Sequence, residues 1–128
     1  MTETDRRHIV KSYGEELAQL DRSIVEMGGL TETQIDAAIR ALVTRDPELA
    51  RRVIADDDKV DDLNTMVDSQ AMRLLALRQP MAKDLRAVIA ALKISSDLER
   101  IGDLAANIAK RAMTVTKAPP MASIHTIV

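Results

Sequence analysis

Two pairs of acidic side chains have the spacing of a metal-binding or acid–base site. Glu99 and Asp103 are four residues apart, and so are Asp57 and Asp61. On an α-helix this spacing puts both side chains of a pair on one face, one turn apart. Two negative charges placed in this way repel each other by roughly a few tenths of a kcal/mol unless something neutralises them. A positive charge near each pair would remove this repulsion.

The positions of the two pairs predict that they meet. If the chain reverses at Pro80 between two antiparallel helices, Asp61 and Glu99 each lie 19 residues from the turn. Asp57 and Asp103 each lie 23 residues from it. The sequence therefore predicts that four carboxylates converge at one height between two helices.

Two kinds of counter-charge suit such a cluster. Mg²⁺, Mn²⁺ and iron bind carboxylate oxygens, whereas Zn²⁺ accepts carboxylates but usually prefers His or Cys. The alternative counter-charges are arginines on the same stretch of chain, namely Arg86, Arg100 and Arg111. A solvated acidic face is a third interpretation, because acid pairs at this spacing are common and Asp58 and Asp62 form another one.

The composition indicates that the elements carrying these residues are helices. Hydrophobic residues make up 46% of the 128 residues, but there is one Tyr and neither Phe nor Trp. Aliphatic side chains suit helix packing, whereas strands are enriched in aromatic and β-branched residues. With 4 Gly and 4 Pro there is also little material for the turns of an all-β fold. The predicted fold class is all-α.

Apolar periodicity and helix-end signals divide the chain into three long helices, at about residues 5–44, 47–78 and 81–113. Asp46 and Pro47 form a helix start, and the residue before Pro80 disfavours the α-helical region. Short connections make neighbouring helices antiparallel, so we expect an up-down-up three-helix bundle. Residues 1–116 form this bundle, and residues 117–128 are predicted to be a linker or the start of a further unit.

Three local features refine this prediction. Gly28 and Gly29 are expected to weaken the first helix locally, without ending it. The acidic run 56–58 is expected to mark a break in the second helix. In the second helix, apolar residues recur every seven positions, as in a bundle seam: Val53, Val60, Val67 and Leu74. In the third helix the apolar face is expected to move after Ser95, from the side of Val88 and Ile89 to that of Ile94 and Ile101, so that the helix either buries different sides along its length or bends there.

Several functional classes are excluded by the sequence. The net charge of −2 with interspersed signs argues against nucleic-acid binding. No apolar run is long enough to span a membrane, no signal peptide is visible, and the absence of Cys agrees with a cytoplasmic protein. No phosphate-binding loop or nucleophile motif is present, so we expect a binding protein and not an enzyme. Two alternatives stay open: a structural oligomerisation module with an idle acidic face, and a carboxylate-bridged metalloenzyme.

Residues 9–113 resemble the PhoU family, on several short motifs. The matching residues are Leu98-Glu99-Arg100-Ile101-Gly102-Asp103, the following Asn107-Ile108-Ala109, Arg78-Gln79-Pro80 with Asp84-Leu85-Arg86, Met27-Gly28-Gly29, and Arg52-Val53-Ile54. Together these motifs are specific.

The resemblance implies a negative regulator of phosphate uptake and of the phosphate-starvation response. Such proteins act as adaptors between a Pst-type phosphate ABC transporter, at its ATPase subunit, and a phosphate-sensing histidine kinase. The resemblance also implies binding of iron, zinc or other metals at Glu/Asp-x-x-x-Asp motifs, which here fall on Glu99–Asp103 and Asp57–Asp61. Family members usually hold two three-helix units, and one unit alone favours a homodimer.

Overall fold

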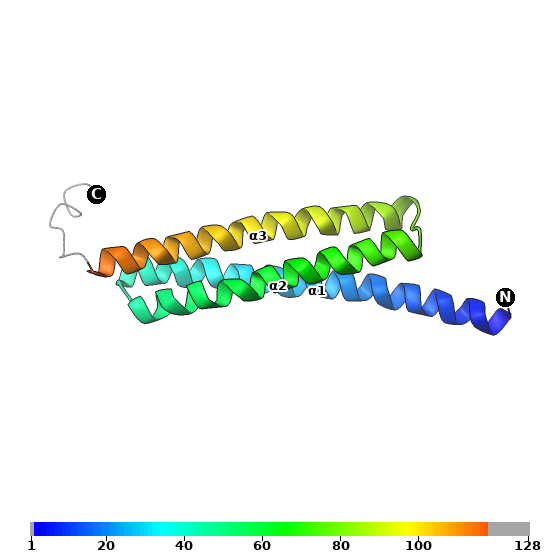
Figure 1. Cartoon of the computed structure of the whole chain (residues 1–128), viewed down its shortest axis with the longest axis horizontal. Coiled ribbons are helices and arrows are strands. Elements are labelled where there is room, and N and C mark those ends of the chain that lie inside the picture. Colours follow the sequence, from blue (N-terminus) through cyan, green and yellow to red (C-terminus); the bar gives the residue numbers. More distant parts are fainter. Residues whose placement is uncertain (1, 118–128) are drawn as a thin grey trace.

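The computed structural model describes residues 2–117, and these form three helices without a strand. They are α1 (Glu3–Thr44), α2 (Pro47–Leu77) and α3 (Ala82–Lys117). The three helices run up, down and up and each packs against the other two (Figure 1). The predicted all-α, antiparallel three-helix bundle is confirmed. The predicted linker, residues 117–128, lies outside the described residues except for its first.

The predicted start of α2 is confirmed in detail. The Asp46 side chain accepts a hydrogen bond from the backbone N–H of Leu49 at 3.2 Å, and Pro47 occupies the first turn. Arg45 closes α1 in the left-handed conformation, with φ of 56°. Thr2 and Asp5 form a capping box at the start of α1. Local sequence thus sets these helix ends, as capping chemistry requires.

The predicted break at residues 56–58 is wrong, because α2 continues through them. Val53 and Val60 on either side are buried against the other helices, and this packing holds the intervening acidic turn in helical form. Helix α1 also continues without interruption through Gly28 and Gly29. The third helix ends at Lys117, four residues later than predicted.

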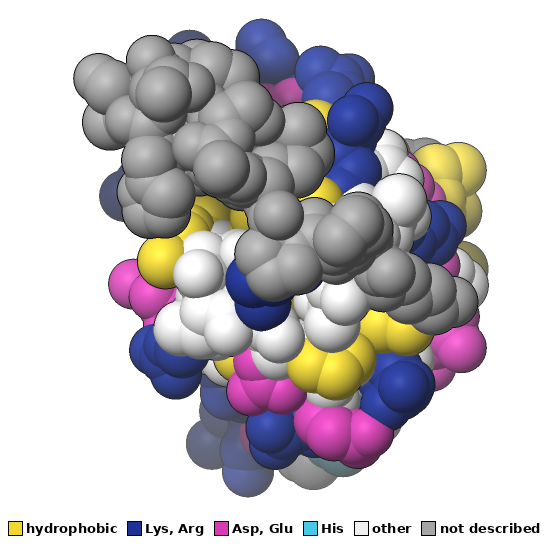
Figure 2. Space-filling model, turned by 90° about the vertical axis from the view of Figure 1, so that its left-hand side faces the viewer, with side chains coloured by type: hydrophobic (Ala, Val, Ile, Leu, Met, Phe, Trp, Pro, Cys, Tyr) yellow, Lys and Arg dark blue, Asp and Glu magenta, His cyan; other side chains and the backbone are white. Residues whose placement is uncertain are grey.

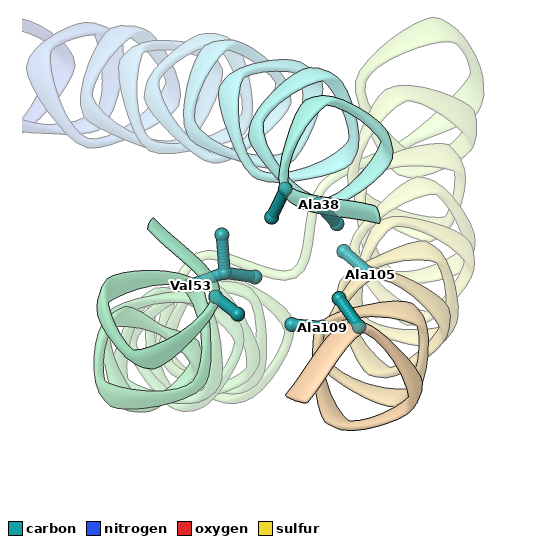
Figure 3. Close-up of a cluster of buried hydrophobic side chains, with 7 residues drawn as sticks. Ala38, Val53, Ala105 and Ala109 are labelled. Carbon is teal, nitrogen blue, oxygen red and sulfur yellow. The ribbon is translucent and has the colours of Figure 1, made fainter. Parts of the chain in front are cut away.

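The heptad prediction for α2 is confirmed. The side chains of Val53, Val60, Val67 and Leu74 are at most 1% exposed. Around them the core divides into three clusters along the bundle axis. The cluster near the α1–α2 turn is built mainly from small side chains, among them Ala38, Ala105 and Ala109, which meet Val53 from the two other helices (Figure 3).

The predicted switch of the apolar face in α3 is wrong. One face is buried along the whole helix, and it consists of small residues: Val88, Ala91, Ser95, Gly102, Ala105, Ala106, Ala109 and Ala112. Ile89, Ile94 and Ile101 are 52%, 45% and 39% exposed. The three helix axes approach closely enough here that only small side chains fit between them. The larger isoleucines are therefore displaced to the flanks.

Side chains from α1 hold both sides of the α2–α3 turn. Glu16 accepts a hydrogen bond from Arg78 at 2.6 Å before the turn, and the Tyr13 hydroxyl donates to Asp84 at 2.8 Å after it. These contacts set the height of α1 relative to the hairpin, and the first turns of α1 project beyond it (Figure 1). None of the three helices is long and apolar enough to cross a membrane.

The opposite end of the bundle carries charges of both signs. Figure 2 looks onto the end where α1 gives way to α2, and Lys and Arg side chains alternate there with Asp and Glu. The ion pair between Arg51 and Glu48 lies at the start of α2. This mixed distribution agrees with the prediction that the bundle has no broad surface of a single sign.

Candidate metal centre

Three of the four predicted carboxylates meet in the structure. One oxygen from each of Asp57, Asp61 and Asp103 lies within 4.8 Å of the other two. We call these three residues the acidic cluster. Asp57 and Asp61 come from successive turns of α2, and Asp103 reaches them from α3, so the register around the α2–α3 turn that the sequence predicts is confirmed.

Glu99, the fourth predicted residue, stands beside the acidic cluster. It is half-buried, and the negative charges of Asp61 and Asp103 act on its carboxylate. The charge of Asp68 acts on it as well; this residue lies further along α2 and was not predicted from the sequence. The signal for Asp68 was available, because it follows Asp61 by seven residues and so faces the same side of the helix.

A glycine allows the two helices to approach at this height. A Cβ atom on Gly102 would lie 3.0 Å from Cγ1 of Val60 and 3.6 Å from Oδ1 of Asp57. Gly102 itself is buried and precedes Asp103. The missing side chain therefore brings the backbone of α3 against α2, beside the carboxylate of Asp57.

Within residues 2–117 no Lys or Arg side chain forms an ion pair with the acidic cluster, although the charge of Lys110 acts on Asp57. Oδ1 of Asp57 is buried and has no hydrogen-bond partner within residues 2–117. Arg86, Arg100 and Arg111, the alternative counter-charges, form no ion pair with these carboxylates in the described part of the chain. The arginine alternative is therefore wrong.

Burial and mutual repulsion act on the protonation of these carboxyl groups. Burial raises the pKa of Asp57, and the charges of Asp61 and Asp103 raise it further, against a smaller opposing effect of Lys110. Burial also raises the pKa of Asp61, followed by the charge of Asp103. The pKa of Glu99 is raised by burial first and by Asp61 second. The folded chain thus favours a reduction of negative charge here.

The metal-free chain is expected to lose stability as the pH rises above about 4. Carboxyl groups whose pKa is raised by folding bind protons more readily in the folded than in the unfolded chain. Their stabilising effect is complete below the ordinary carboxyl pKa of about 4 and is lost as the pH rises through the higher folded values. Urea unfolding in EDTA between pH 4.5 and 8 would measure this slope.

Two matched variants test whether the pH dependence of stability arises from the acidic cluster. Asp57→Asn combined with Asp61→Asn should flatten it, whereas Asp97→Asn, an exposed acid on α3, should leave it unchanged. A slope of equal size in both variants would contradict the assignment to the acidic cluster.

The donor set fits a hard cation. Carboxylate oxygens are the ligands preferred by Mg²⁺, Mn²⁺ and iron, and a cation would give the buried Oδ1 of Asp57 the partner that it lacks. Asp58 and Asp62, the neighbouring acid pair, are exposed and lie outside the acidic cluster, and His8 is exposed as well. The arrangement can therefore bind a cation between α2 and α3 through side chains of both helices.

Comparison with known proteins gives consistent matches over most of the chain. The sequence profile described as "PhoU domain" matches residues 24–112. A phosphate-specific transport system accessory protein PhoU homolog of Caulobacter vibrioides is 52% identical over 117 residues, which are 91% of this chain and 51% of that protein. Its namesake in Xylella fastidiosa is 43% identical over 121 residues, 94% of this chain and 50% of that protein.

A solved structure shares the fold. The crystal structure of PhoU from Pseudomonas aeruginosa superposes with a TM-score of 0.80 at 36% identity, covering 90% of this chain and 56% of that one. The chain therefore spans about half the length of the relatives it matches.

Proposed function

We propose that this chain, which belongs to the PhoU family, acts in phosphate transport as a regulatory binding module whose acidic cluster holds a metal cation. The observation that carries the proposal is the convergence of three carboxylates from two helices, with one buried oxygen that has no hydrogen-bond partner and no ion pair among the described residues. The names of its relatives, phosphate-specific transport system accessory proteins, support the link to phosphate transport.

The cation would be held by Asp57, Asp61 and Asp103, with Glu99 beside them. A bound divalent or trivalent cation, such as iron, Mn²⁺, Mg²⁺ or Zn²⁺, supplies the positive charge that these side chains lack. The carboxylates on α2 and α3 would hold the cation between the two helices. Gly102 allows these helices to approach each other. The cluster then serves as a structural and recognition element, without a catalytic step.

The regulatory role is negative control of phosphate uptake and of the phosphate-starvation response. In this proposal the bundle is a cytoplasmic adaptor that contacts the ATPase subunit of a Pst-type phosphate ABC transporter and a phosphate-sensing histidine kinase. Three long helices present extended surfaces for such contacts, and the acidic cluster between α2 and α3 belongs to one of them.

Self-association belongs to the same proposal. Large apolar side chains are half-exposed on the flanks of α1 and α3, including Ile39, Ile101 and Leu104 at 48%, 39% and 53% exposure. Exposed apolar surface of this kind favours packing against a further protein surface, and a homodimer is the simplest arrangement. Sedimentation equilibrium of the chain would measure the association.

Neutralising the acidic cluster in the chromosomal gene is expected to derepress phosphate-starvation genes in phosphate-rich medium. The combined changes Asp57→Asn, Asp61→Asn and Asp103→Asn remove the ligands but preserve side-chain size, so the protein should accumulate normally. A starvation-promoter reporter should rise several-fold, towards the level in a deletion strain. Asp97→Asn is the matched control. Unchanged reporter expression in the deletion strain would contradict the regulatory role itself.

A further inference from the structure

A chain of hydrogen bonds leads from the core of the bundle to the edge of the acidic cluster. Ser95 on α3 is fully buried, and its hydroxyl donates to Sδ of Met27 on α1 at 3.4 Å. The same oxygen accepts a hydrogen bond from Nδ2 of Asn64 on α2 at 2.7 Å. One residue from each helix thus takes part.

In the structure the amide of Asn64 turns its NH₂ group towards Ser95. The Ser95 hydroxyl has one proton, which it donates to Met27, and its oxygen accepts from Asn64. The NH₂ group of Asn64 therefore points inward, and the amide oxygen is at the other end. That oxygen receives no hydrogen bond from the described residues and is not among the unpartnered oxygens buried within them. It is therefore available to a ligand.

Asn64 lies about one helical turn from Asp61, the member of the acidic cluster nearest to the α2–α3 turn. It follows Asp61 by three residues on α2, and its partner Ser95 precedes Glu99 by four residues on α3. Residues at these spacings share a helix face. Asn64 and Ser95 are consequently the next contact between α2 and α3 on the side of the α2–α3 turn. An amide oxygen is a neutral ligand that hard cations accept together with carboxylates.

We propose that Asn64 completes the cation site as a neutral oxygen ligand and that Ser95 is the positioning residue that directs it. The inference rests on the cation binding proposed above. It also connects the site to α1, which contributes no carboxylate to the acidic cluster, because Met27 holds the hydroxyl of Ser95. Cation binding and the packing of α1 are then linked, since each stabilises the same arrangement.

Calorimetric titration of the metal-free chain with MnCl₂ tests both roles. We expect Asn64→Ala to weaken Mn²⁺ binding about tenfold, the size found when residues that support a metal site are removed. Ser95→Ala should weaken it by a smaller factor, because the amide of Asn64 then turns freely. If Ser95 acts only through Asn64, Ser95→Ala should add no further loss to Asn64→Ala. Ser96→Ala, an exposed neighbour on α3, is the control and should bind like the wild type.

A measurement without metal separates positioning from general stability. In the metal-free wild type the side-chain amide protons of Asn64 should exchange slowly with solvent by NMR, and Ser95→Ala should accelerate their exchange. Asn64 is only half-buried, so Asn64→Ala is expected to fold. If Ser95→Ala does not fold, Mn²⁺ binding by Asn64→Ala still tests whether Asn64 is a ligand.

The outcomes distinguish this inference from the proposed cation site. Absence of Mn²⁺ binding by the wild type would overturn the cation site and the role of Asn64 with it. Binding that Asp103→Asn abolishes but Asn64→Ala leaves unchanged would overturn the role of Asn64 alone. Equal weakening by Ser95→Ala with and without Asn64→Ala would show a general structural effect and overturn the positioning role.

Discussion

Millimolar MnCl₂ is expected to raise the melting temperature of the metal-free chain by about 10 °C. A cation that binds the assembled acidic cluster, but not the unfolded chain, stabilises the fold by about 2.7 kcal/mol at a free concentration one hundred times its Kd. For a domain of this size, 1 kcal/mol corresponds to roughly 3–5 °C. Scanning calorimetry after EDTA treatment and dialysis, with NaCl added to matched ionic strength, measures the shift without general screening effects.

The triple variant Asp57→Asn, Asp61→Asn, Asp103→Asn should reverse the order of stabilities. Without cation it is expected to melt above the wild type, because the repulsion between three carboxylates within 4.8 Å is gone. With MnCl₂ it should melt below the wild type, because it lacks the ligands. A Mn²⁺ shift of equal size in both proteins would place the cation elsewhere and contradict the assignment.

The sequence predicts the candidate site well because helical spacing and hairpin register are rigid constraints. Once Pro80 is the turn, the rise per residue of two antiparallel helices decides which side chains are level. Asp57, Asp61 and Asp103 therefore come together as expected. Asn64 was missed because an asparagine has no charge to mark it, and its contact with Ser95 depends on a hydroxyl group in the core.

The core was harder to predict because hydrophobicity alone does not show how closely helices approach. Ile94 and Ile101 are more hydrophobic than the alanines beside them, so the apolar pattern assigned them to the core. Packing instead selects by size: Ala105 and Ala109 fit between three close helices, and the isoleucines lie at the edges. In the same way, the acidic run 56–58 suggests a break by local propensity, but tertiary packing of Val53 and Val60 overrides it.

Gly102→Val is expected to destabilise the chain by about 3 kcal/mol and to weaken cation binding. The new Cβ would lie 3.0 Å from Cγ1 of Val60, closer than normal contact, and Val60 is fully buried and cannot move aside. Overpacking of this kind costs about 1–3 kcal/mol, and the γ-methyl groups of valine add to it. The helix-propensity gain over glycine, at most about 0.5 kcal/mol, does not offset this cost. Urea unfolding and MnCl₂ titration measure the two effects.

Gly29→Val is the matched control, because a Cβ there meets no atom within 4 Å and the variant should be as stable as the wild type or slightly more so. Val60→Ala should partly rescue Gly102→Val, since it removes the clashing methyl groups, and the double variant should lose less stability than the two single costs predict. Costs that simply add would mean that the valine at this position collides with something other than Val60. In that case Val60 would not be the residue that limits the approach of α2 and α3 at Gly102, and Oδ1 of Asp57, 3.6 Å from the same Cβ, would be the next candidate.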